Sequence, residues 1–107
     1  MALKAAFIFI APHGDPQRHR AITATPEVEV ITLAVSSYRQ AGEVARELAE
    51  QGCAAIELCG GFGHQGVAIV AAAVGELAAV GAVRFDPHPL LGHRSGDELA
   101  RAPASGE

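Results

Sequence analysis

The sequence predicts one soluble domain of the α/β class, in which a small parallel sheet of four strands carries helices on both faces as three layers. Two observations lead to this fold class. Apolar runs of strand length alternate with segments of helical periodicity, and the linkers between them are short and rich in glycine and proline. Half of the 107 residues are hydrophobic but only 5% are aromatic, so the core must consist mainly of small aliphatic side chains, which suit close packing of helices on a sheet.

The chain begins with an apolar run, residues 3–11, that ends at Pro12 and predicts a buried strand. Asp15 and Pro16 then predict the start of a short helix, because Asp is a frequent N-cap residue and Pro suits the first helical position. Pro26 requires this helix to end just before it, because the residue that precedes a proline disfavours the helical conformation.

Residues 28–35 are rich in β-branched side chains and predict the second strand. The helix that follows is the best-supported element, because Ser37 and Gln40 form a capping box and Gly52 suits its C-terminal end. One face of this helix is apolar, and its exposed face carries opposite charges at helical spacing. The apolar positions are Ala41, Val44, Ala45, Leu48 and Ala49, and the charged positions are Arg39, Glu43, Arg46 and Glu50.

The third strand is predicted over residues 54–59 and the fourth over residues 78–85. Between them, residues 64–74 predict a second long helix, which Gly75 ends. The stretch 67–74 of this helix has no polar residue on any side, and a helix of that kind is normally buried. A chain of this size has too little protein to cover it, so we expect a homo-oligomer that associates through this helix.

Strands and helices that alternate with short loops predict parallel strands joined by right-handed crossovers. The expected order of the four strands is 2-1-3-4, as in flavodoxin-like members of the Rossmann-like sheets, which makes the first and third strands neighbours. Ligands bind such sheets beyond the carboxyl ends of those strands, here between loops 12–15 and 60–64. The domain is predicted over residues 1–92, and residues 93–107 are expected to form a C-terminal arm that is partly disordered.

Charge and composition exclude several classes of partner. The net charge is −4 and the eight basic residues form no cluster, which excludes nucleic acid and anionic membrane surfaces. No run approaches the roughly 20 apolar residues of a membrane span. Cys53 and Cys59 bracket a predicted strand and lie too far apart to form a disulfide, so we expect a cytoplasmic protein.

The most informative stretch lies over residues 59–66, where Gly61, Gly63 and Gly66 form a G-x-G-x-x-G pattern between a predicted strand and a predicted helix. Glycines let backbone N–H groups approach an anion, and a helix N-terminus favours negative charge. Asp86 follows at the spacing of a ribose-binding acid, but the unit does not open the chain and no second half follows, which disfavours a dinucleotide. The expected ligand is a small phosphate- or carboxylate-bearing metabolite. Its predicted contacts are Gly60, Gly61, Phe62, Gly63, His64, Arg84 and Asp86. The alternative is a glycine turn that only packs the helix onto the sheet.

Three residues are candidates for acid–base catalysis: Glu57, His13 and His64. Glu57 interrupts a strand expected to be central, where a buried carboxylate needs a partner or a function. Arg84 on the neighbouring strand is the expected partner, so a structural ion pair is the alternative. Metal binding is the weaker hypothesis, because no recognised ligand spacing supports it. Its candidate ligands are His13, His19, Cys59 and His88.

The leading functional hypothesis is therefore binding of a small anionic metabolite at the glycine-rich loop, with acid–base turnover of the isomerase or lyase type if the protein is an enzyme. One alternative is a non-catalytic regulatory or assembly subunit that uses the apolar helix, and a weaker one is a metal-dependent hydrolase. The sequence identifies no cofactor.

The sequence also resembles a small bacterial α/β family of unknown function. The resemblance rests mainly on IELCGGFG at residues 56–63, on VRFD at residues 83–86 and on Ser95-Gly96-Asp97, with Asp15-Pro16, His19-Arg20 and Ser37-Tyr38 as further matches. It covers nearly the whole chain and implies the fold, but no activity, substrate or cofactor.

Overall fold

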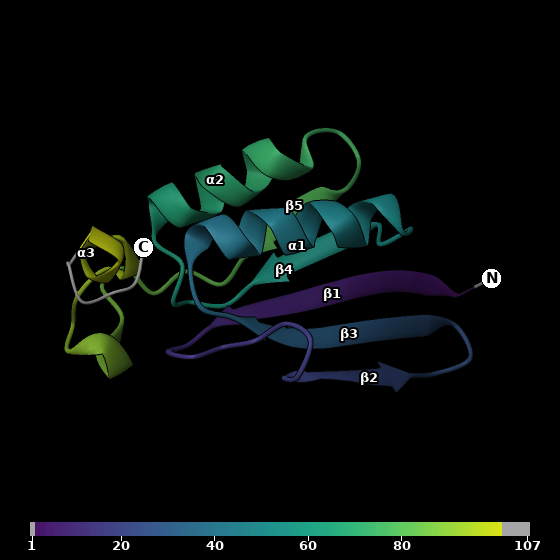
Figure 1. Cartoon of the computed structure of the whole chain (residues 1–107), viewed down its shortest axis with the longest axis horizontal. Helices are drawn as coiled ribbons and strands as arrows, with labels where there is room; N and C mark the ends of the chain where they lie inside the picture. The colour runs from purple at the N-terminus through teal and green to yellow at the C-terminus, as the bar shows by residue number, and fades with distance from the viewer. Residues whose placement is uncertain (1, 102–107) are drawn as a thin grey trace.

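The computed structural model describes residues 2–101 as a mixed five-stranded sheet with two long helices packed on it (Figure 1). In chain order the elements are β1 (Leu3–Ile10), β2 (Arg20–Ala24), β3 (Val28–Val35), α1 (Tyr38–Glu50), β4 (Ala55–Leu58), α2 (His64–Val74), β5 (Ala79–Ala82), the 3-10 helix η1 (Pro89–Leu91) and α3 (Gly96–Arg101). The strand order across the sheet is β2-β3-β1-β4-β5.

The four strands predicted from the sequence lie in the predicted order. β1 pairs in parallel with both β3 and β4, and β5 pairs in parallel with β4. The chain therefore leaves β1 toward one side of the sheet and returns to the other side at β4, which makes the carboxyl ends of β1 and β4 the point where the winding reverses. This arrangement brings the loops after β1 and β4 to one edge.

The predicted helix after Asp15 is wrong, and with it the all-parallel sheet of four strands. Asp15 does accept hydrogen bonds from the N–H groups of Gln17 and Arg18, but only a turn follows, and residues 20–24 form β2 antiparallel to β3. The physical reason is tertiary: pairing with β3 supplies residues 20–24 with backbone hydrogen bonds that override the local helix signal. Pro26 then lies in the hairpin turn between β2 and β3 instead of ending a helix.

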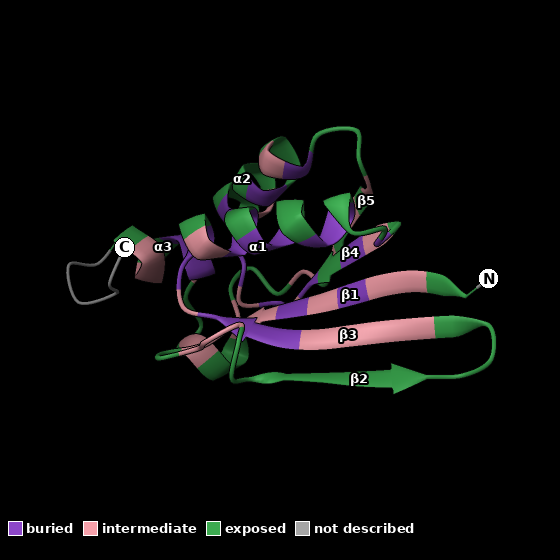
Figure 2. Ribbon diagram, turned by 45° about the vertical axis from the view of Figure 1, so that its right-hand side comes forward, coloured by how far each residue is buried: buried purple, intermediate pink, exposed green. Residues whose placement is uncertain are grey.

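The three-layer expectation is also wrong, because α1 and α2 lie side by side on the same face of the sheet (Figures 1 and 2). A helix on the opposite face would have to come from the connection between β1 and β3, and that connection contains β2 instead. The core lies between the helices and this one face of the sheet. Its fully buried members include Ile8, Leu33, Ile56, Leu58 and Val70.

The local signals for the two helices are confirmed. Ser37 is the N-cap of α1, its side chain accepts from the N–H of Gln40, and the five predicted apolar positions are all buried. Gly75 ends α2 with φ at 63°, in the left-handed region that glycine tolerates. The ion pairs Arg39–Glu43 and Arg46–Glu50 form on the exposed face of α1.

Candidate functional site

The carboxyl edge of the sheet gathers a small charged cluster around Asp86. Oδ2 of Asp86 lies 3.2 Å from Nε2 of His64, the first residue of α2, and 3.3 Å from Nη2 of Arg84. The His64 side chain is 76% exposed, whereas those of Arg84 and Asp86 are 30% and 18% exposed. The cluster therefore has one side chain in water and two that are mostly covered. These three residues belong to the predicted ligand contacts, and the fold brings them together.

The guanidinium of Arg84 is only partly satisfied. Nη1 donates to the backbone carbonyl of Phe62 inside the glycine turn. Nε and Nη2 are buried and have no hydrogen-bond acceptor among the described residues, although Nη2 lies within ion-pair distance of Asp86. Buried polar groups in folded proteins nearly always have a partner, which is ordered water or a bound ion where the protein supplies none.

The backbone amides of the glycine turn, by contrast, are used internally. The carboxylate of Asp97 accepts from the N–H of Gln65 at 2.9 Å and from that of Gly66 at 3.2 Å. The hydroxyl of Tyr38 accepts from the N–H of Gly63 at 3.0 Å and donates to Asp97 at 2.8 Å. The carboxylate of Asp97 thus occupies the start of α2, where the sequence predicted an external anion.

The electrostatics of this contact fit a charged carboxylate. Burial alone would raise the pKa of Asp97, but the hydrogen bonds from Gln65, Tyr38 and Gly66 outweigh it and hold the pKa below its usual value. Burial also raises the pKa of Tyr38, so its hydroxyl stays protonated and donates to the carboxylate. A helix N-terminus favours negative charge, and Asp97 supplies it.

Close packing accounts for the glycines of the turn. A Cβ on Gly63 would lie 2.3 Å from the carboxylate of Asp97, and one on Gly66 would lie 2.5 Å from the ring of Tyr38. A Cβ on Gly61 would lie 2.9 Å from the side chain of Ile10. The spacing that resembles a phosphate-binding loop therefore coincides with the spacing that packing of these three side chains requires.

Glu57 lies away from this cluster. It is exposed on the face of the sheet that carries no helix, in register with Phe7 on β1 and Gly81 on β5. The expected Glu57–Arg84 ion pair does not form, because Arg84 follows β5 and pairs with Asp86 instead. Glu57 therefore does not share a site with His64 in this structure.

The remaining predicted histidines are spread along the same edge. His13 is exposed in the loop after β1 with φ at 63°. Nδ1 of His19 accepts from the N–H of Asp15, and Nδ1 of His88 accepts from the N–H of Leu90. Cys59 accepts through sulfur from the N–H of Gly61, and both cysteines are free. Within residues 2–101 no three His, Cys, Asp or Glu side chains come close enough to hold a metal ion.

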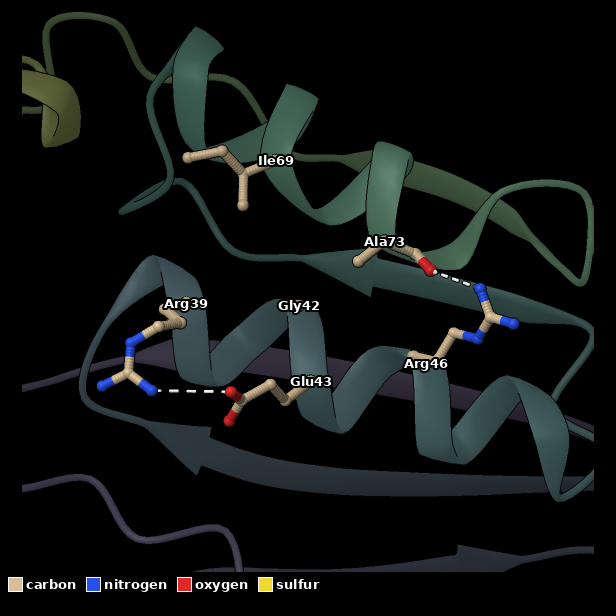
Figure 3. Close-up of a pocket in the computed structure, with 6 residues that line it drawn as sticks. All are labelled: Arg39, Gly42, Glu43, Arg46, Ile69 and Ala73. Carbon is tan, nitrogen blue, oxygen red and sulfur yellow. Dashed lines mark hydrogen bonds and ion pairs between the residues drawn. The ribbon is translucent and has the colours of Figure 1, made fainter.

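A groove of about 440 Å³ lies on the outer surface between α1 and α2, far from the charged cluster (Figure 3). Ile69 and Ala73 of α2 point toward Gly42 of α1, and Ile69 is 45% exposed. Arg46 donates across the groove to the carbonyl of Ala73, at 3.2 Å. The part of α2 that the sequence marked as unusually apolar therefore lines this groove.

Sequence reasoning missed Asp97 and Tyr38 as members of the site. Both lie in matched segments of the resemblance, Ser95-Gly96-Asp97 and Ser37-Tyr38, so a signal was present. Asp97 falls in the predicted C-terminal arm, yet it is only 8% exposed and lies in the first turn of α3, against the start of α2. The disorder expected for the last six residues concerns residues outside those that the structure describes.

The comparisons with known proteins identify a family of unknown function. A model described as "Family of unknown function (DUF6506)" matches residues 3–98, which confirms the resemblance to a small family of unknown function. Neither the curated proteins nor the solved structures gave a match. Within residues 2–101, no helix has the length and apolar character that crossing a bilayer requires.

Proposed function

We propose that this chain, which belongs to the family of unknown function DUF6506, binds a small phosphate- or carboxylate-bearing metabolite beside Arg84. The observation that carries the proposal is the buried guanidinium of Arg84: in the described part of the chain its Nε has no acceptor, and its Nη2 lies 3.3 Å from Oδ2 of Asp86 without making a hydrogen bond. An arginine fork matches the geometry of a carboxylate or phosphate, so an anion is the natural acceptor for these donors.

In this proposal the glycine turn positions Arg84 and does not bind the anion through its backbone amides, as the glycine spacing had predicted. Its amides at Gly63, Gln65 and Gly66 already donate to Tyr38 and Asp97, so they are not available to the ligand. The turn instead holds Arg84 through the carbonyl of Phe62. The ligand is therefore expected at the side chains of the cluster and not at the backbone of the turn.

His64 is the residue best suited to move a proton in this site. Its Nε2 lies 3.2 Å from the carboxylate of Asp86, which favours the tautomer with the proton on Nε2. Nδ1 is then free to accept a proton from a carbon next to the ligand's carboxylate, and the imidazolium that forms stays paired with Asp86. Return of that proton to another carbon would complete an isomerisation, and loss of a leaving group would complete an elimination.

Anion binding is testable without knowledge of the metabolite. Titration of ¹⁵N-labelled protein with inorganic phosphate, and separately with malonate, should shift the amide resonances of residues 62–64 and 84–86. Arg84→Gln should weaken the affinity by about 10-fold or more, because the charged donors are lost. Arg39→Gln is the matched control, since Arg39 lies on the exposed face of α1 and should leave the affinity unchanged.

Arg84 is partly buried, so its replacement can also disturb the fold. Arg84→Lys keeps the charge and removes the fork, and it should bind phosphate more weakly than the parent while it retains the same circular dichroism spectrum. Shifts that map to loop 12–15 instead of residues 62–64 and 84–86, or equal affinity in the parent and both Arg84 variants, would contradict the proposal.

A non-catalytic assembly role is the second candidate, and the groove beside Ile69 favours it. Ile69 is a large apolar side chain left 45% exposed in a helix whose polar residues are confined to its first turn. In this role a second copy of the chain associates through residues 67–74. Ile69→Glu should then reduce the mass of the particle measured by light scattering, and an unchanged mass would remove this helix from the interface.

A further inference from the structure

The face of the sheet opposite the helices carries no helix in the described part of the chain, and only its carboxyl end, at Ala34, is buried (Figure 2). The central strand β1 shows this directly. Ala6 and Ile8, which face the helices, are at most 1% exposed, whereas Ala5, Phe7 and Phe9 on the opposite side remain partly exposed. β1 has hydrogen-bonded neighbours on both sides, so this exposure can come only from an open face.

This open face is almost free of charge. The pairing registers place on it alternate residues of each strand. They are Leu3, Ala5, Phe7 and Phe9 of β1, Val28, Val30, Thr32 and Ala34 of β3, Ala21 and Thr23 of β2, Ala55 and Glu57 of β4, and Ala79 and Gly81 of β5. Glu57 is the one ionisable side chain in this set. Lys4 and Glu29 lie on the helix side, where their charges act on Cys53.

The size of the open face matches a small specific interface. Strands of eight, eight, five, four and four residues, at about 4.8 Å between strands and about 3.3 Å per residue, cover on the order of 450 Å² in projection. Two such faces in contact bury roughly 1,000 Å² of accessible surface, which is the lower bound for a specific interface. An apolar patch of this extent matches the largest patch on a typical monomer, and such patches are often functional.

We propose that a second copy of this chain covers the open face, so that two sheets pack against each other around a twofold axis. A flat surface of small and apolar side chains is complementary to itself, and a twofold axis brings the same patch of both copies together. The chain carries a net charge of −4, and this face is where two copies can approach with few like charges opposed. Glu57 on β4 is the direct neighbour of Phe7, so its carboxylate must reach water across Gly81 of the edge strand β5, which has no side chain to block it.

The occupant is a second copy and not a charged partner, because the face offers neither basic side chains nor an acidic cluster to recognise one. Phe7 and Thr32 are direct neighbours across β1 and β3 and mark the middle of the contact. Sheets that pack face to face lie about 10 Å apart, which leaves room for their side chains and none for a lysine that cannot reach water.

Analytical ultracentrifugation over a concentration series tests the proposal. The full-length protein should sediment as a dimer, with twice the mass of the chain. Thr32→Lys should weaken the dimer by about 100-fold or more, because the ammonium group would be buried without a partner. Thr23→Lys tests the same face on the exposed edge strand β2, where a lysine does not disturb the fold of the monomer.

Gln51→Lys is the matched control, because it adds the same charge at the exposed C-terminal end of α1, outside both candidate interfaces, and should leave the dimer intact. Ile69→Lys separates the two interfaces, because it changes only the groove beside α2. Circular dichroism confirms that each variant is folded. A parent protein that stays monomeric throughout, or dimers that persist unchanged in both threonine variants, would overturn the proposal. Dissociation by Ile69→Lys alone would overturn it as well and would assign the contact to α2. Because phosphate binding at Arg84 is measured separately, either proposal can fail without the other.

Discussion

The hydroxyl of Tyr38 lies between two groups that are distant in the sequence, since it donates to Asp97 at 2.8 Å and accepts from the N–H of Gly63 at 3.0 Å. Tyr38 is the first residue of α1, Gly63 precedes α2 and Asp97 is the second residue of α3. One carboxylate and one hydroxyl thus connect the starts of three helices. Most of the predictions below depend on this contact.

Replacement of Asp97 should destabilise the protein. Asp97→Asn keeps the shape of the side chain but removes the charge of the carboxylate, which accepts two hydrogen bonds from the start of α2 and one from Tyr38. The expected loss in the free energy of unfolding is about 2 kcal/mol, which corresponds to a fall in Tm of roughly 10 °C for a domain of this size. Urea denaturation measures it. Glu98→Gln is the control, since Glu98 is exposed and next in the chain, and a comparable loss there would contradict the assignment.

The contribution of Asp97 should disappear in acid. Its pKa is lower in the folded protein than the ordinary value of 3.8, so folding favours the ionised form. The stabilisation is then fully present above about pH 5 and is lost as the pH falls through 3.8 toward the folded pKa. The difference in the free energy of unfolding between the parent protein and Asp97→Asn, measured by urea denaturation, should therefore decrease as the pH falls from about 5 through 3.8. A difference that stays constant down to about pH 3 would show that the charge of Asp97 does not contribute to stability.

A variant without the carboxylate should respond to added anions. Asp97→Ala leaves the N–H groups of Gln65 and Gly66 without an acceptor at a helix N-terminus, where small anions bind well. Formate should therefore raise the Tm of Asp97→Ala more than that of the parent protein, measured at constant ionic strength with chloride as the reference salt. Equal increases in both proteins would mean that the amides find another partner once Asp97 is removed.

Substitution of the turn glycines should be costly only where a side chain already fills the space. Gly66→Ala places a Cβ 2.5 Å from the ring of Tyr38 and should lower the free energy of unfolding by about 2 kcal/mol. Gly81→Ala is the control, because no atom lies within 4 Å of its Cβ position, and it should be neutral or slightly stabilising. Thermal unfolding of both variants measures the difference. Equal behaviour would argue against close packing as the reason for Gly66.

Much of the fold was predictable because its signals are local. The capping residue Ser37, the apolar face of α1 and the glycines that end both long helices each depend on a few neighbouring residues. The order of the four parallel strands followed from the alternation of strands and helices. β2 was not predicted, because Asp15 and Pro16 are typical of a helix start. The strand forms only through its pairing with β3, which the local sequence does not indicate.

The candidate site was predictable in part. His64, Arg84 and Asp86 meet as expected, because they follow neighbouring parallel strands whose carboxyl ends share an edge. The function of the glycine turn was harder to infer, since its amides can serve an outside anion or a side chain of the same protein. The acceptor is Asp97, which is 31 residues from Gly66 in the sequence. Local sequence patterns do not predict a contact between residues so far apart.

The tie between Tyr38 and Asp97 spans 59 positions of the chain, and it has a consequence for how the molecule acquires its shape. Until residue 97 has been synthesised, two amide protons at the beginning of α2 have only water to bind. During synthesis, the starts of the two long helices therefore cannot be joined through this carboxylate before α3 is available.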